Sequence, residues 1–146
     1  MTEKEQDNLF YFCTLVEFIA RKTKNSRRTV ISNFSKQSIE RQLRLAEVNH
    51  CLSFEQVSDE LIEEFSIPTG DCDSVGECRY VVPSESAIGR VYQRLILSTE
   101  KGDIPQTTID VFSSFISDEI SNFNSNVYYS NPSYLLCSYM EGKLLA

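Results

Sequence analysis

The stretch from Leu9 to Ala20 constrains the fold more than any other part of this chain. Its apolar residues stand at positions 9, 12, 13, 16, 19 and 20, and on a helix they would cover most of the circumference. A helix with so much apolar surface has to lie at the centre of a domain. It is about eleven to fourteen residues long, which is too short to cross a bilayer. The sequence therefore predicts a core helix with other elements packed around it.

Capping residues and apolar spacing predict the remaining elements, and all of them are helical. Pro68, Gly70, Gly76 and Pro83 interrupt the pattern between residues 66 and 83, which indicates a connecting loop. We expect an all-α protein of six or seven short helices around the central N-terminal helix. Its closely packed halves would be a four-helix segment, residues 1–65, and an acidic three-helix segment, residues 84–146. The expected helices span residues 7–22, 27–34, 36–46, 54–65, 84–96, 109–123 and 132–142.

The chain has 146 residues, a common size for one compact domain. It contains five cysteines, an odd number, and no recognisable signal peptide or membrane-spanning segment. These features favour a reducing, cytoplasmic location. The net charge of −7 argues against general nucleic-acid binding, because attraction to phosphates depends on cationic side chains.

The charge is unevenly divided along the chain. Between residues 21 and 44 there are eight basic residues and one acidic residue, Glu40, whereas residues 45–146 contain five basic and sixteen acidic residues. Such asymmetry is typical of a partner-binding surface. The predicted binding residues are the eight cations of this basic segment: Arg21, Lys22, Lys24, Arg27, Arg28, Lys36, Arg41 and Arg44.

Four interpretations of the charge pattern stay open. The basic segment can be a surface that binds another protein, or an ordinary solvated face. Residues 26–46 also have the length of a helix-turn-helix, with Lys36, Gln37, Arg41 and Arg44 available for DNA or RNA, although the turn lacks the usual glycine. An acidic mimic of nucleic acid is a further alternative, and would use Asp59, Glu60, Glu63 and Glu64.

The sequence offers no convincing catalytic or metal-binding pattern. His50, Cys51, Cys72 and Cys78 are the residue types that bind zinc, but their spacing differs from that of zinc knuckles. No glycine-flanked nucleophile or phosphate-binding loop occurs. We therefore expect a protein without enzymatic activity and without a cofactor or metal.

Two groups in the C-terminal half are candidates for contact with a partner. Tyrosines combine a large contact area with little loss of side-chain entropy, and four of them lie close together near Asn124, Asn126 and Asn131. The alternative is that they only close the core. The second group consists of three arginines and one tyrosine beside them. Its cations can line an anion pocket or offset neighbouring carboxylates. The tyrosines are Tyr128, Tyr129, Tyr134 and Tyr139, and the second group comprises Arg79, Tyr80, Arg90 and Arg94.

The first 65 residues resemble a known family. They contain an apolar opening helix with Phe12-Cys13, a polar turn ending in Asn25-Ser26, a short helix to Phe34, and His50 ahead of the run from Val57 to Ile62. This order is similar to that of small bacterial helical proteins of uncharacterised function, often encoded beside ADP-ribosyltransferase-like toxins in presumed toxin–antitoxin or mobile-element loci. The family's usual glycine near the first turn is missing, and the half after Pro68 has no counterpart. The resemblance implies a partner-binding or neutralising role and no catalytic residues.

Together these observations predict a non-catalytic macromolecule-binding protein of bacterial or phage type. Another protein is the expected partner, and a homodimer is an open alternative. An antitoxin-like or inhibitor-like role agrees with the resemblance, and the rival hypothesis is a helix-turn-helix DNA-binding regulator.

Overall fold

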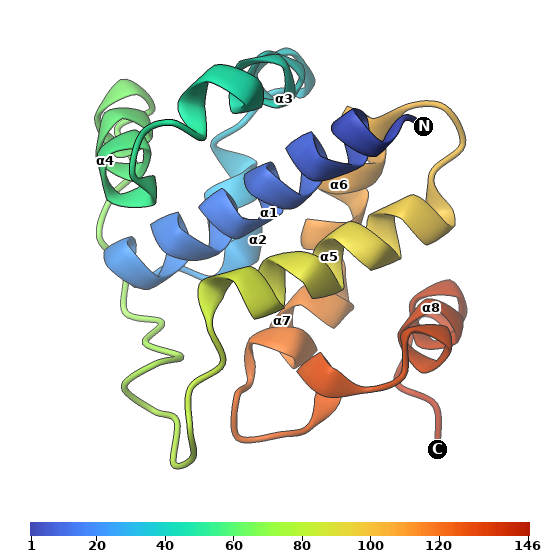
Figure 1. Cartoon of the computed structure of the whole chain (residues 1–146). Helices are drawn as coiled ribbons and strands as arrows, with labels where there is room; N and C mark the ends of the chain where they lie inside the picture. Colours follow the sequence, from blue (N-terminus) through green and yellow to red (C-terminus); the bar gives the residue numbers. More distant parts are fainter.

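The computed structural model describes all 146 residues and contains eight α-helices, one 3₁₀ turn and no β-strand (Figure 1). The prediction of an all-α fold is confirmed, with one helix more than expected. No helix combines the length and the apolar character that a membrane span requires. The helices are α1 (Glu3–Thr23), α2 (Arg27–Ser32), α3 (Lys36–Asn49), α4 (Phe54–Glu64), α5 (Glu85–Thr99), α6 (Ile104–Phe112), α7 (Phe115–Ser121) and α8 (Pro132–Glu141), and the 3₁₀ turn is η1 (Val127–Tyr129).

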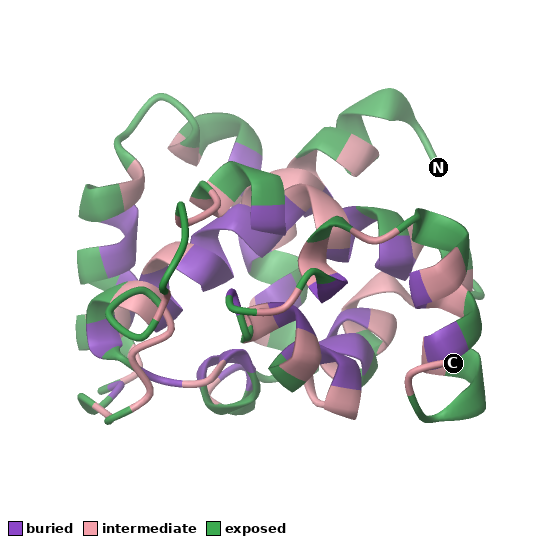
Figure 2. Cartoon of the chain, turned by 90° about the horizontal axis from the view of Figure 1, so that it is seen from below, coloured by how far each residue is buried: buried purple, intermediate pink, exposed green.

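Helix α1 lies at the centre, as its apolar residues predict. Helices α2, α3, α4 and α5 all contact it, and buried side chains occupy almost every position from Leu9 to Ala20. One hydrophobic core contains residues of α1 together with Val111 and Phe112 of α6 and Leu135 of α8. Figure 2 shows the buried residues on the inward faces of the helices and the exposed residues outside.

Helices α1 and α5 form the central pair of the fold. They run side by side in opposite directions (Figure 1). Gly89 permits their close approach, because a Cβ atom at this position would lie 2.9 Å from both the Cα and the N atom of Thr14. At one end of the pair, the side chain of Gln93 donates a hydrogen bond to the Gln6 carbonyl at 2.8 Å. The close packing of α1 on α5 thus depends on a residue without a side chain.

Aromatic side chains attach α4 and the turn between α2 and α3 to α1. The ring of Phe54 lies between those of Tyr11 and Phe18, with centroid distances of 4.9 and 4.7 Å. Phe34 packs edge-on against Phe12 at 5.6 Å. Such stacked and edge-on pairs add to the free energy gained from burial.

The predicted helix caps are found at Ser26, Ser35, Ser84 and Asn131, and Gly142 ends α8 in a left-handed conformation. The run Ser53-Phe54-Glu55-Gln56 also predicts a capping box, in which Ser53 and Gln56 bond each other's backbone amides. Ser53 does cap α4, but the Gln56 side chain donates to Glu60 at 3.5 Å and makes no bond back to Ser53.

The predicted start of the first helix was wrong, because α1 begins at Glu3 and not near Asp7. Thr2 caps this earlier start by accepting a hydrogen bond from the Glu5 amide. Lys4 pairs with Glu47 of α3 at 2.9 Å, which holds the first turn against its neighbour.

The single helix expected over residues 109–123 was also wrong. The chain forms α6, which starts earlier at Ile104, and α7, with a break at Ser113 and Ser114. The hydroxyl of Ser114 donates to the Val111 carbonyl at 2.7 Å, and the backbone of Ser114 is extended. Serine side chains compete with the backbone for hydrogen bonds in this way, so they favour helix ends.

The loop of residues 66–83 is held tightly against the junction of α1 and α2. The amides of Gly70 and Cys72 donate to the carbonyls of Thr23 and Lys24, each at 2.8 Å. A Cβ atom at position 70 would meet the Lys24 carbonyl oxygen at 2.6 Å, so the loop approaches closely only because residue 70 is glycine. Arg21 of α1 and Arg27 of α2, on either side of this junction, also donate hydrogen bonds to the loop.

Candidate functional site

Two of the predicted binding residues, Arg21 and Arg27, lie inside the molecule around Glu17 of α1. The Arg27 Nε donates to Glu17 Oε1 at 2.8 Å, and the Arg21 Nε donates to Glu17 Oε2 at 2.7 Å. Only 1 % of the side chains of Glu17 and Arg27 is exposed. We name these three residues the buried ion cluster.

The buried ion cluster also binds the loop of residues 66–83. Arg27 donates to the Ser74 hydroxyl at 3.0 Å and Arg21 to the Pro83 carbonyl at 2.8 Å. Both guanidinium groups stack on the ring of Phe123, at 5.6 and 5.1 Å from its centroid. Burial alone would raise the pKa of the Glu17 carboxyl, but the hydrogen bonds and charges of Arg27 and Arg21 outweigh it and hold the pKa below its usual value.

Five more cations of the basic segment pair with carboxylates at the surface. Their partners come from three different helices, α3, α4 and α7, and from the turn before α6, so the cations are spread over several faces. The pairs are Lys22 with Asp59, Arg28 with Asp118, Lys36 with Asp103, Arg41 with Glu64, and Arg44 with Glu40. Of the eight predicted binding residues, only Lys24, at the end of α1, has no carboxylate within 4 Å.

This pairing changes what the basic segment presents to a partner. The residues proposed for a helix-turn-helix, Lys36, Arg41 and Arg44, each have a carboxylate beside them that reduces the local positive potential. Two residues of the acidic helix α4, Asp59 and Glu64, are partners in these same pairs. Opposite charges that are separated in the sequence are therefore brought together by the fold.

The arginines without a carboxylate partner are in the C-terminal half: Arg79, Arg90 and Arg94. Arg90 and Arg94 stand one turn apart on α5, and both line a hollow of about 360 Å³ between α5, η1 and the start of α8. We name it the α5–η1 hollow. Val91, Leu95 and Leu135 give it an apolar lining.

A second hollow adjoins the first and shares two of its residues, Tyr128 and Tyr129. It has a volume of about 770 Å³, and its lining also includes Tyr80, Val81 and Asn126. We name the surface formed by the two hollows the tyrosine face. Tyr80, Val81 and Tyr129 are 70, 90 and 68 % exposed, so large apolar side chains stand in solvent there.

Asn124 holds the loop of residues 66–83 beside η1. Its side chain accepts a hydrogen bond from the Arg79 amide at 2.8 Å and donates one to the Glu77 carbonyl at 3.0 Å. Tyr80 follows directly in the chain and is thereby placed near Tyr128 and Tyr129. No Asp or Glu lines either hollow, although the chain has 21 acidic residues.

The four C-terminal tyrosines divide between the two roles expected for them. Tyr128 and Tyr129 belong to the tyrosine face, where their rings pack edge-on at 4.8 Å. Tyr134 closes the core, because its hydroxyl donates to the Leu145 carbonyl at 2.8 Å and so holds the C-terminal segment. Tyr139 lines a different hollow.

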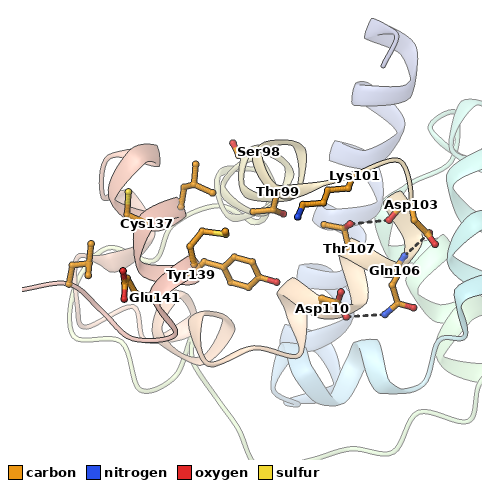
Figure 3. A pocket seen from close by; sticks show the side chains of 13 residues that line it. Ser98, Thr99, Lys101, Asp103, Gln106, Thr107, Asp110, Cys137, Tyr139 and Glu141 are labelled. Carbon is orange, nitrogen blue, oxygen red and sulfur yellow. Dashed lines mark hydrogen bonds between the residues drawn. The ribbon is translucent and has the colours of Figure 1, made fainter.

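This other hollow lies between α5, α6 and α8 and has a volume of about 890 Å³ (Figure 3). Its polar groups largely bind one another: Gln106 donates to Asp110 at 2.9 Å, Thr107 donates to the Asp103 carbonyl at 3.0 Å, and Asp103 caps the Gln106 amide (Figure 3). Asp103 also pairs with Lys36, whose hydrogen bond holds the pKa of the Asp103 carboxyl below its usual value. We find no nucleophile with an adjacent base among the lining residues.

The residues considered for zinc are not brought together. No group of three or more His, Cys, Asp and Glu side chains is placed to hold a metal ion, and all five cysteines are free thiols. His50 is exposed at the end of α3, and Cys13 is buried in α1.

No protein family, curated protein or solved structure matches the chain. The class of protein is defined by its own geometry: an all-helical domain whose basic segment is paired internally and whose free arginines and exposed tyrosines lie in the other half.

Proposed function

We propose that this is a non-catalytic protein that binds another protein through the tyrosine face. We propose that it is a protein of bacterial or phage type that acts in the cytoplasm. The resemblance of residues 1–65 to small proteins encoded beside toxins supports an antitoxin-like or inhibitor-like role. The proposal places the contact on α5, η1 and the loop of residues 66–83, and not on the exposed cations of the basic segment.

The observation that carries the proposal is the composition of the tyrosine face. Exposed tyrosine and valine side chains adjoin unpaired arginines and asparagines, and acidic residues are missing from the lining of both hollows. Tyrosine and arginine are enriched where proteins bind each other, because each combines a large contact area with directional hydrogen bonds. The face complements a partner surface that is apolar and acidic.

A protein partner is favoured over a nucleic acid by charge. The chain carries a net charge of −7, and a nucleic acid adds a dense row of negative phosphates. Arg41 and Arg44, which the helix-turn-helix hypothesis needs, share their surroundings with Glu64 and Glu40.

The test compares two matched double variants in their binding to the partner. The partner is first captured from the native host with the wild-type chain and then purified. We expect the Tyr80→Ser/Tyr129→Ser variant to bind it at least about tenfold more weakly, a loss of about 1.4 kcal/mol. Both tyrosines are largely exposed, so thermal unfolding should be unchanged.

The control is the Arg41→Ala/Arg44→Ala variant, which should bind as tightly as the wild type. Loss of binding in this variant with full binding in the tyrosine variant would contradict the proposal. Retardation of duplex DNA by the wild-type chain, abolished by Arg41→Ala/Arg44→Ala and weakened steeply by salt, would favour the DNA-binding regulator instead.

A further inference from the structure

One of the two arginines that line the α5–η1 hollow, Arg90, is held in position by contacts within the protein. The guanidinium carbon of Arg90 lies 3.9 Å from the centroid of the Phe10 ring, and its Nη1 donates to Gln93 Oε1 at 2.8 Å. Gln93 is itself buried and held by the Gln6 carbonyl. Arg90 is therefore oriented by α1 and by its own helix together.

The fixed guanidinium still has free donors. An arginine has five N–H groups, and the hydrogen bond to Gln93 is the only one that Arg90 makes within the protein. Stacking on an aromatic ring uses the flat face of the group and leaves the N–H groups at its edge for an acceptor. An oxyanion that reaches this edge gains hydrogen bonds at a small cost in side-chain entropy.

Arg94 adds a second cation to the same hollow. It is exposed and forms no side-chain hydrogen bond or ion pair. Like charges at positions i and i+4 of a helix repel each other, so an anion between Arg90 and Arg94 relieves a repulsion that the free protein carries. The start of α8 also lines the hollow, with Asn131 and Pro132, and the N-terminal end of a helix favours negative charge.

The rest of the lining indicates what surrounds the anion. Val91, Leu95 and Leu135 are apolar, and Tyr128 and Tyr129 continue into the second hollow. A free inorganic anion would leave this apolar surface unused. A peptide that carries an acidic side chain beside apolar ones would cover both parts of the hollow.

From this geometry we propose that the α5–η1 hollow is a subsite for an acidic peptide segment of the partner, with a carboxylate bound by Arg90 and Arg94 and apolar neighbours on the half-buried side chains of Val91 and Tyr128. The inference rests on the proposed protein-binding function and names the chemistry of the segment that the face recognises. Arg90 supplies the fixed donors and Arg94 the mobile charge. The charge arrangement favours this ligand over single-stranded nucleic acid, which would also stack on tyrosines.

The test selects random peptides displayed on phage against the wild-type protein and against the Arg94→Glu variant. Wild type should enrich peptides with Asp or Glu beside an apolar residue, and Arg94→Glu should shift the preference away from acidic residues. A synthetic copy of the most enriched peptide is then titrated against the wild type. Replacing its Asp by Asn and its Glu by Gln should weaken binding about tenfold, and Arg94→Met should weaken binding of the acidic form by a similar factor.

Arg94 is exposed, so its variants are expected to fold, and thermal unfolding verifies this. Arg90→Lys keeps the charge but loses the planar group on Phe10, and should also weaken the acidic peptide. Enrichment without acidic residues, equal enrichment by Arg94→Glu, or no enrichment at all would overturn the inference. So would tighter binding of an oligothymidylate or oligouridylate probe than of the acidic peptide.

Different experimental results would overturn the protein-binding function and the acidic subsite. If the captured partner loses affinity for Tyr80→Ser/Tyr129→Ser but not for Arg94→Met or Arg90→Lys, the protein-binding function stands and the acidic subsite is overturned. If neither pair of variants affects the partner, the tyrosine face itself is not the binding surface.

Discussion

At the scale of single residues, the outcome for the basic segment depends on Glu17. This carboxylate stands within the most apolar stretch of the chain and is buried with Arg27, and the partly exposed Arg21 also pairs with it. A buried carboxylate requires a cation beside it. Glu17 was therefore the one signal in the sequence that some cations of the nearby segment pair with a carboxylate inside the protein. The sequence does not show which of the eight cations these are.

Loss of the Glu17 carboxylate should destabilise the protein strongly. Glu17→Gln leaves Arg27 buried without its partner, and breaking a buried pair in this way costs about 3–5 kcal/mol. Chemical denaturation at pH 7 measures the loss. Arg44→Ala, which removes a cation from an exposed pair, is the control and should cost less than about 1 kcal/mol. Equal losses in the two variants would contradict the structural role given to the cluster.

The cost of Glu17→Gln should depend on pH. The pKa of Glu17 is lower in the folded protein than in the unfolded chain, so its contribution to stability is present above the unfolded pKa of about 4.3 and is lost as the pH falls through the folded pKa. The wild type loses this contribution in acid and the glutamine variant has none to lose. The difference in unfolding free energy should therefore narrow below about pH 4, and a constant difference down to pH 2 to 3 would speak against an ionised Glu17.

The cysteines should differ sharply in their reactivity toward a thiol reagent at pH 8. Burial raises the pKa of the Cys13 thiol and blocks access to it, whereas Cys51 and Cys137 are exposed. In the native protein Cys51 and Cys137 should be modified first, and Cys13 only after denaturation. Mass spectrometry of the modified peptides identifies the order, and early modification of Cys13 would show that α1 is not enclosed as described.

At the scale of elements, the helices were predictable wherever a cap and an apolar face agreed. Ser26, Ser35, Ser84 and the Asn131-Pro132 pair each mark a helix start that the structure contains. The sequence signals failed where serine occurs within an apolar pattern, as at Ser113 and Ser114, because the spacing of Ile109, Phe112, Ile116 and Ile120 fits one helix as well as two. The loop of residues 66–83 was expected, but not its attachment by Gly70 and Asn124, since these contacts join residues far apart in the chain.

The packing of α1 on α5 gives a prediction at this scale. Gly89→Ala would improve helix propensity by about 1 kcal/mol, but its methyl group would clash with the backbone of Thr14, which cannot move alone. We expect a net loss of about 1–3 kcal/mol, as is usual for overpacking. Equilibrium unfolding tests this, with Arg94→Ala on the exposed side of the same helix as a control that should change stability by less than about 0.5 kcal/mol. A stabilised Gly89→Ala variant would mean that the two helices are farther apart than described.

At the scale of the whole molecule, the fold removes the charge division that the sequence suggests. Seven of the eight cations in the basic segment have carboxylate partners, several of them from the acidic half. The arginines left without a carboxylate partner lie outside the basic segment and near exposed tyrosines: Arg79 in the loop of residues 66–83, and Arg90 and Arg94 on α5. Neither the pairing nor the meeting of Tyr80 with Tyr128 and Tyr129 could be predicted, because both depend on contacts between distant parts of the chain.

The most direct measurement is photo-crosslinking in the native host with p-benzoylphenylalanine placed either at Tyr129, on the tyrosine face, or at Arg44, in the basic segment. Both side chains are largely exposed, so both probes are accessible and should leave the fold intact. We expect the probe at Tyr129 to crosslink one defined protein and the probe at Arg44 not to crosslink it. Crosslinking of that partner from Arg44 and not from Tyr129 would contradict it.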